Sequence, residues 1–330
     1  MKGKNVLVTG ATGFTGGHLC RRLVREGARV RALVRPGRDA SALESPGIEA
    51  VPGDLTDAGS LKDAVSGVQT VYHIGAAFRD EGAPRQRFWD VNVTGTQSLM
   101  DAALDAGVRR FVHCSTVGVQ GEIQDPPADE EAPYNPGDHY QASKTDGERL
   151  VLQYIRERGL PGVIFRPVGI YGPGDTRFLK LFRHIASGRF RMIGSGDVLY
   201  HLTYIDDLVS GIVLCGTRPG IEGEIFTLGG PEYTTLNEFV RLVAGALDVP
   251  VPTRHFPVWP VWLAGAACEV LCRPFPIHPP IYRRRVDFFI KDRAFDISKA
   301  RRVLGYEPGV DMKTGLRKTV EWYRSEGLLS

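Results

Sequence analysis

The chain has 330 residues, a length typical of two domains or of one large α/β unit with a smaller appended part. Apolar residues make up 42% and charged residues 24%, which excludes a largely disordered chain and a fibrous repeat. Lys and Arg number 41 against 38 Asp and Glu, a net charge of +3, and so small an excess is not typical of a nucleic-acid-binding protein.

The cysteine pattern indicates free thiols. The five cysteines are sparse, odd in number and without CxxC spacing, so the sequence predicts neither a disulfide framework nor a zinc site. The histidines have no metal-ligand spacing either, and no metal is expected. Free thiols are typical of a reducing compartment, so a cytoplasmic location is expected.

No segment is typical of targeting or of a membrane span. Met1–Lys4 is basic, but the apolar run that follows, Val6–Val8, is too short for a signal peptide. The longest uncharged apolar stretch, 256–268, contains Pro257 and Pro260, and a membrane-spanning helix needs about 20 apolar residues. This stretch is therefore not expected to span a membrane.

The first two-thirds of the chain alternates short apolar runs with amphipathic segments. Buried strands are predicted at Asn5–Thr9, Ala28–Val34, Gln69–His73, Arg110–Cys114 and Val163–Phe165. Helices are predicted at His18–Glu26, Val93–Ala106 and Tyr140–Arg158. This alternation predicts an α/β fold with a Rossmann-type, doubly wound parallel sheet.

The pattern loosens after about Ile170, where Pro and Gly become frequent. A strand at Glu224–Leu228 and a helix at Leu236–Leu247 are the clearest later elements. We interpret residues 1–170 as a dinucleotide-binding domain to which segments near 200–229 return. Residues 171–330 are interpreted mainly as a smaller, C-terminal substrate-binding domain.

The first predicted strand runs into a glycine-rich turn and a helix start. Gly10, Gly13 and Gly16 have the spacing GxxGxxG. In a βαβ unit such glycines allow a tight turn, the approach of the backbone to a pyrophosphate, and close packing of helix on strand. The helix N-terminus then offers free N–H groups to the phosphates. The turn therefore predicts a site for a dinucleotide cofactor.

The end of the second strand favours NADP over NAD. An acidic residue at this place binds the ribose hydroxyls of NAD, whereas Arg accommodates the 2′-phosphate of NADP. The strand here ends in Arg35, with Arg38 close behind and no acidic residue before Asp39. NAD stays open as the alternative, because these arginines are equally compatible with a solvated loop.

Tyr140 and Lys144 are spaced to lie side by side on one helix face. A phenol has a pKa near 10 and is a poor base at neutral pH. A positive charge about 4 Å away is expected to lower that pKa by about 3 units. Ser115 and Thr116 end the buried strand 110–114, at the sheet edge where ligands bind in this architecture. One of these hydroxyls is expected to hold the substrate oxygen while Tyr140 moves the proton.

These motifs, taken together, resemble the extended short-chain dehydrogenase/reductase superfamily, its NAD(P)-dependent epimerase/dehydratase group. The resemblance covers nearly the whole chain. The matching segments, in order, are TGATGFTG at Thr9–Gly16, Gly53-Asp54-Leu55, the loop Tyr72–Ala77, Asn92, the Ser115-Thr116 pair, Tyr140 with Lys144, and Arg166-Pro167 running to Gly174.

The resemblance implies roles for individual residues. Thr116 matches the catalytic hydroxyl, with Ser115 just before it, Tyr140 the acid/base, and Lys144 the residue that holds the ribose. The cofactor-binding residues implied are Gly10, Thr12, Gly13, Phe14, Thr15, Gly16, Arg35, Asp54, Leu55, Ala76, Ala77, Asn92, Tyr140, Lys144 and Pro167. A homodimer through the helices 93–106 and 140–158 is also expected, since the first carries an apolar face of Val93, Leu99, Ala102, Ala103 and Ala106.

Two departures from the pattern bear on the substrate. Sugar-nucleotide members of the family usually carry Asn where this chain has Gly169, and often Arg at about the place of Tyr200. Both departures remove groups that would bind a diphosphate. The chain therefore looks more like the 3β-hydroxysteroid dehydrogenase branch. Arg283–Arg285 points the other way, because it lies near the place of another phosphate-binding Arg.

The segment 257–272 is unusually apolar and carries Trp259, Trp262 and Leu263. Three interpretations stay open: a core helix of the smaller domain, the mouth of an apolar substrate site, or a peripheral membrane contact beside basic residues.

The sequence thus predicts an oxidoreductase that interconverts a secondary alcohol and a ketone, on a 3β-hydroxysteroid, sterol-like or other apolar small molecule. The alternative is a UDP-sugar 4-epimerase or dehydratase with tightly held NAD. A non-catalytic cofactor sensor is disfavoured, because such a protein has no need of Tyr140 and Lys144.

Overall fold

The computed structural model describes residues 1–43, 45–78, 84–272 and 283–329. A seven-stranded parallel sheet lies at its centre, with the strand order β10-β6-β5-β4-β1-β2-β3. The strands are β1 (Asn5–Thr9), β2 (Arg29–Val34), β3 (Ile48–Pro52), β4 (Thr70–His73), β5 (Arg110–Cys114), β6 (Gly162–Pro167) and β10 (Ile225–Leu228). The predicted doubly wound parallel sheet is confirmed.

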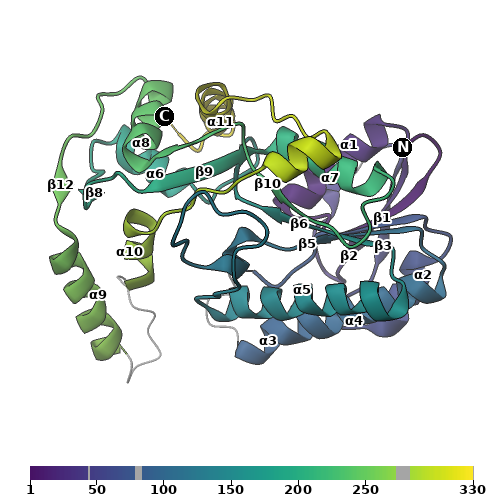
Figure 1. Ribbon diagram of the computed structural model, residues 1–330. Coiled ribbons are helices and arrows are strands. Elements are labelled where there is room, and N and C mark those ends of the chain that lie inside the picture. Colours follow the sequence, from purple (N-terminus) through teal and green to yellow (C-terminus); the bar gives the residue numbers. More distant parts are fainter. Residues whose placement is uncertain (44, 79–83, 273–282, 330) are drawn as a thin grey trace.

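Helices cover both faces of this sheet (Figure 1). One face carries α1 (Phe14–Arg25) and α7 (Ile205–Thr217), and the other carries α2 (Ala58–Val65), α4 (Gly95–Asp105) and α5 (His139–Arg158). The alternation of side chains along β1 explains the two layers. Val6 and Val8 belong to the core under α1 and α7, whereas Leu7 belongs to the core under the other helices.

The remaining elements pack at one end of the large sheet. They include a three-stranded sheet of β7 (Gly169–Tyr171), β9 (Leu199–Tyr204) and β11 (Tyr233–Thr235), and a pair formed by β8 (Met192–Ile193) and β12 (His255–Phe256). The helices are α6 (Leu179–Ala186), α8 (Leu236–Leu247), α9 (Val258–Cys272), α10 (Arg283–Ile290) and α11 (Met312–Ser325).

Short helical elements occur elsewhere in the described chain. They are η1 (Ser41–Leu43), α3 (Arg85–Trp89), η2 (Asp90–Thr94), η3 (Val117–Gln120) and η4 (Ala300–Leu304).

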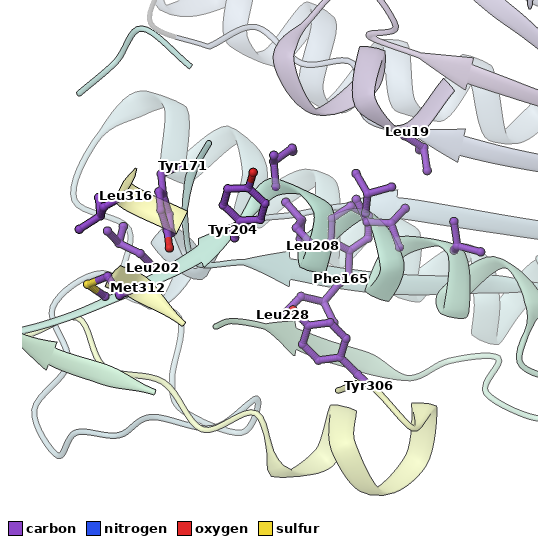
Figure 2. Packing of buried hydrophobic residues seen from close by; sticks show 14 of the residues in the cluster. Leu19, Phe165, Tyr171, Leu202, Tyr204, Leu208, Leu228, Tyr306, Met312 and Leu316 are labelled. Carbon is purple, nitrogen blue, oxygen red and sulfur yellow. The ribbon is translucent and has the colours of Figure 1, made fainter. Parts of the chain in front are cut away.

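One continuous core joins these elements to the sheet. Figure 2 shows Phe165 of β6 and Leu228 of β10 near Leu208 of α7, with Tyr306 next to Leu228. The buried Tyr306 phenol donates a hydrogen bond to the Gly229 carbonyl at 2.8 Å, so its polar end is satisfied. This packing explains why β10, from the later part of the chain, pairs with β6 in the large sheet.

The apolar segment 257–272 forms helix α9, and it is not a core helix. Trp259 is 67% exposed, Leu263 52% and Trp262 42%. Figure 1 shows α9 beside β12, at the end of the molecule farthest from the large sheet. Across the described ranges of the chain, no helix is both long enough and apolar enough to traverse a bilayer.

Most of the apolar face expected to form a dimer is buried in the core of this chain. Leu99, Ala102 and Ala103 of α4 are buried in the core beneath α2, α4 and α5. Val93 is half-buried and Ala106 is exposed. The homodimer therefore stays a prediction that rests on the outer surfaces of α4 and α5, and not on this face.

Candidate active site

The carboxyl ends of β1, β4, β5 and β6 open onto a cavity of about 970 Å³. Its lining includes Thr9, Gly10, Thr12, Gly13, Phe14, Thr15, Gly16, Arg35, Arg38, Asp54, Leu55, Ala76, Ala77, Phe78, Arg87, Cys114, Ser115, Thr116, Tyr140, Lys144, Pro167, Val168, Gly169, Ile170 and Arg177. Every residue expected to bind the cofactor lines this cavity except Asn92.

The glycine turn after β1, which contains Gly10, Gly13 and Gly16, forms one wall of the cavity. Gly10 has φ of +69°, in the left-handed region that favours glycine. A Cβ at Gly16 would lie 2.1 Å from the Gly10 carbonyl oxygen, so only glycine allows α1 to start this close to the strand. The first turn of α1 has no acidic residue and no side-chain cap. Its N–H groups therefore fit the pyrophosphate of a dinucleotide.

Asp54 and Arg35 face each other at the far end of the cavity. Partial burial raises the pKa of Asp54, but hydrogen bonds from the Thr56 amide and hydroxyl and the charges of Arg35 and Arg87 hold that pKa below its ordinary value. Asp54 is therefore ionised at neutral pH. Arg35 lines the same cavity, and its contact with the 2′-phosphate of NADP stays a prediction.

Asn92 lies behind the cavity and supports its wall. Its side chain is buried, accepts a hydrogen bond from the Ala77 amide at 2.8 Å and donates to the Ala77 carbonyl at 3.2 Å. It also donates to the Ser143 hydroxyl at 2.9 Å. Asn92 therefore ties the loop after β4 to α5, and it positions the wall of the cavity instead of lining it.

Lys144 and Tyr140 start the long helix α5, which Asp138 caps by accepting a hydrogen bond from the Gln141 amide. The Lys144 ammonium is buried and donates to the Cys114 carbonyl at 2.6 Å. Burial lowers the pKa of Lys144 below its ordinary value, which Cys114 and Glu148 oppose. The two side chains line the same cavity, as their spacing predicted.

The electrostatics at Tyr140 differ from the expectation. Burial raises the pKa of the Tyr140 phenol above its ordinary value, and Cys114 and Asp138 raise it further. The cation that opposes this rise is Arg177, not Lys144. The physical reason is that Tyr140 is largely desolvated, with its ring 4.9 Å from that of Phe78.

Ser115 and Thr116 both reach the cavity, but their hydroxyls differ. Thr116 Oγ1 accepts a hydrogen bond from the Gly118 amide at 3.0 Å and caps η3. The Ser115 hydroxyl is buried and has no hydrogen-bond partner among the described residues. Thr116 keeps its own proton for donation to a ligand and is partly exposed, whereas the Ser115 hydroxyl is enclosed by protein, so Thr116 is the better-placed candidate.

Arg177 is the site residue that the sequence analysis missed. Its Nε donates to Asp175 at 2.6 Å and its Nη2 to the Ile170 carbonyl at 2.8 Å. The guanidinium also lies over the ring of Phe14, 5.5 Å from the centroid. Asp175 is in turn held by α11, because the Tyr323 hydroxyl donates to the Asp175 carbonyl at 2.7 Å. In the sequence, the signal that could have pointed to Arg177 was its place in the loop that follows a strand end.

The surroundings of Gly169 and Tyr200 explain why these positions differ from the residues usual in sugar-nucleotide members. A Cβ at Gly169 would lie 2.5 Å from Leu202 Cδ2, so an Asn there requires Leu202 to move. Tyr200 is buried against Phe239 and Phe288 and does not line the cavity. The side chains of Arg283–Arg285 lie outside the described part of the structure.

A family comparison agrees with this geometry. The model of the NAD dependent epimerase/dehydratase family matches residues 6–229, which include the glycine turn, Tyr140 and Lys144. The match covers both the strands that build the cavity and the residues that line most of it.

Three curated relatives align over nearly all of the chain. Sterol demethylase protein B of Methylococcus capsulatus is 33% identical, over 98% of this chain and 99% of its own. The 3 beta-hydroxysteroid dehydrogenase/Delta 5-->4-isomerase of Mycobacterium tuberculosis is 33% identical, over 97% and 90%. The 2-alkyl-3-oxoalkanoate reductase of Stenotrophomonas maltophilia is 30% identical, over 95% and 97%.

Solved structures share the fold over the same length. The structure of gox2253 has a TM-score of 0.85 at 32% identity, covering 99% of this chain and 100% of its own. The dTDP-glucose 4,6-dehydratase DesIV of Streptomyces venezuelae, solved with NAD and TYD bound, has a TM-score of 0.79 at 29% identity, covering 98% and 100%.

Proposed function

Because the chain belongs to the NAD-dependent epimerase/dehydratase family, we propose that it interconverts a secondary alcohol and a ketone by hydride transfer. One observation carries the proposal. Tyr140, Lys144, Ser115 and Thr116 line the same cavity as the glycine turn. A nicotinamide cofactor, when bound there, would accept or return the hydride.

The residues of the chain take separate parts in this reaction. Tyr140 takes the proton from the alcohol or returns it to the ketone oxygen, and Thr116 or Ser115 holds that oxygen by a hydrogen bond. Lys144 would hold the ribose of the cofactor and add positive charge behind Tyr140. Arg177 opposes the effect of burial on the phenol, which favours the phenolate that oxidation requires.

For the substrate we propose an apolar alcohol of the 3β-hydroxysteroid or sterol-like kind. The cavity lining beyond the expected cofactor residues includes the uncharged Val168, Gly169 and Ile170, and the charge of Arg177 there is paired with Asp175. Gly169 and Tyr200 supply no group for a diphosphate, and an unneutralised diphosphate in a partly desolvated pocket is costly. Relatives named for a hydroxysteroid and a sterol support the same class.

The alternative is a sugar-nucleotide 4-epimerase or dehydratase with retained NAD. It is favoured by the likeness to the nucleotide-bound dehydratase structure. It needs a phosphate-binding cation on the substrate side, and Arg283–Arg285 is the segment of the sequence that offers one.

Net reduction of added cofactor separates the two functions. A dehydrogenase reduces free NAD or NADP when a hydroxysteroid is added, whereas an epimerase returns the hydride and leaves the free cofactor unchanged. Titration with UDP and with a hydroxysteroid, cofactor present, gives the second measurement. Micromolar UDP binding that Arg285→Ala abolishes, without net cofactor reduction by any alcohol, would contradict the proposed substrate class.

A further inference from the structure

Helix α9 exposes apolar side chains that a water-facing helix rarely carries. Trp259 is 67% exposed, Trp262 42% and Leu263 52%. The apolar surface continues onto Phe256 of β12, which is 51% exposed, and onto Val251 just before it, at 46%. None of these residues lines the active-site cavity. A helix that is apolar all round is normally buried in protein or in contact with lipid.

Basic side chains adjoin this apolar surface. Arg254 is exposed and directly precedes β12, while the exposed Arg189 lies just before β8, with which β12 pairs. The Met192 amide donates to the Arg254 carbonyl at 3.0 Å, which brings the two basic segments side by side. The sequence has no Asp or Glu from 249 to 268 or from 176 to 196. These two segments therefore add only positive charge beside the helix, whereas α10, which packs against α9, carries Asp287 and is followed by Lys291.

We propose that α9, Phe256 and the adjoining Arg189 and Arg254 form a surface that binds an anionic lipid bilayer. Trp side chains are favoured at the boundary between lipid headgroups and acyl chains, because one end of the ring system is apolar and the other polar. Arg attracts anionic headgroups. With 15 residues the helix is about 22 Å long, shorter than the hydrocarbon layer, so it lies along the surface instead of crossing it.

Charge also argues against a second copy of the chain as the occupant. A two-fold contact centred on α9 would place the same patch of each subunit against itself. Arg189 and Arg254 of one copy would then lie near the same residues of the other, without an acidic partner in either segment. A surface that carries negative charge fits the patch better than its own copy does.

Vesicle flotation tests this proposal with the full-length protein. Phosphatidylcholine vesicles with about one-third phosphatidylglycerol are compared with vesicles of phosphatidylcholine alone. We expect binding to the anionic vesicles, weakened at high salt, and a blue shift of Trp fluorescence. Trp259→Ser with Trp262→Ser should weaken binding about tenfold or more, and Arg189→Glu with Arg254→Glu should remove the preference for phosphatidylglycerol.

Matched controls make the result specific. Tyr233→Ser removes a comparably exposed aromatic ring on β11, and Arg109→Glu changes an exposed Arg elsewhere; neither should alter binding. Cofactor binding reports folding of every variant, since α9 does not line the cavity. Failure of the wild-type protein to bind either vesicle would overturn the proposal. So would equal binding by the Trp variant, or a dimer in solution that the Trp substitutions convert to monomer.

Discussion

At the scale of single residues, the proposed chemistry depends on how the chain controls the charge of one phenol. Tyr140 is placed by the first turn of α5 and desolvated by its surroundings, with Phe78 packed against its ring. Burial alone keeps the phenol protonated at neutral pH. The positive charge of Arg177 opposes this effect, so Arg177 must be held in place by its own partners.

Tyr140→Phe keeps the ring and removes the proton carrier. We expect turnover to fall by about two to four orders of magnitude, the usual range for acid–base catalysis, with cofactor affinity little changed. Steady-state kinetics and cofactor titration measure the two effects. Ser115→Ala and Thr116→Ala, compared in the same assay, show which hydroxyl acts; near-full activity of Tyr140→Phe would rule out its role.

Arg177→Met should move the pH dependence of alcohol oxidation to higher pH. Oxidation needs the deprotonated phenol, and Arg177 lowers the pKa of Tyr140, so the apparent pKa of kcat/KM should rise when this charge is removed. Arg177→Lys keeps the charge and serves as the control. An unchanged pH profile in the Met variant would show that Arg177 acts only in positioning.

Arg35→Ala tests the preference for NADP. If the guanidinium meets the 2′-phosphate, its removal should weaken NADP binding by about tenfold or more and leave NAD nearly unchanged. The dissociation constants of both cofactors are measured in the wild type and in the variant. Equal losses for both cofactors, or a wild-type preference for NAD, would contradict this assignment.

At the scale of elements, the sequence was most informative where one pattern dominates. β1 and β5 are short, buried apolar runs, and both were predicted with the bounds that the structure has. β3 (Ile48–Pro52) was missed because it is an edge strand with no fully buried residue. The sequence did not decide among the three interpretations of α9, because an apolar helix has the same sequence pattern whether it is buried or exposed.

The site shows the same division between local and long-range information. The turn at Gly10 and the spacing of Tyr140 and Lys144 are local, so the sequence sufficed to place them. Arg177 could not be assigned in this way, because its role depends on contacts with Asp175, Ile170 and Phe14 that the folded chain brings together. The position of Asn92 behind the cavity wall, bonded to Ala77, depends on such contacts as well.

Helices α4 and α5 are the elements through which we expect a homodimer. Leu150 of α5 is half-buried and packs partly on the core, so Leu150→Glu should prevent association at a moderate cost in stability. Leu242→Glu, at a half-buried position on α8, is the matched control. Sedimentation velocity at micromolar concentration distinguishes the species, and a wild-type protein that sediments only as a monomer would refute the dimer.

At the scale of the whole molecule, the centre of the sheet contains two buried histidines whose rings lie 5.3 Å apart. Burial, with a contribution from Lys144, lowers the pKa of His73 to about 3, and burial lowers that of His113 well below its ordinary value. His73 is hydrogen-bonded to Thr9 and Thr96, whereas the His113 ring has no hydrogen-bond partner among the described residues. Both rings are neutral in the folded protein at neutral pH.

The free energy of unfolding should therefore fall as the pH drops below about 6.5. In that range the unfolded chain binds protons that the folded chain excludes, and each such histidine contributes up to about 1.4 kcal/mol per pH unit. Urea unfolding at several pH values measures the slope. His113→Leu removes one group and should reduce the slope by about that amount; an identical slope in this variant would show that His113 is not the cause.

The contact between Tyr323 and Asp175 ties the active site to nearly the last residues of the chain. A ribosome releases the glycine turn and the Tyr140–Lys144 pair long before Tyr323 emerges, because proteins are made from the N-terminus onward. The loop that carries Arg177 gains this support only when α11 docks. The segments proposed to bind the cofactor are therefore synthesised first. The contact that supports the Arg177 loop on the substrate side forms last. Tyr323→Phe, which removes only this hydrogen bond and keeps the ring in the core, should leave nucleotide affinity nearly unchanged and lower turnover, as cofactor titration and steady-state kinetics would show.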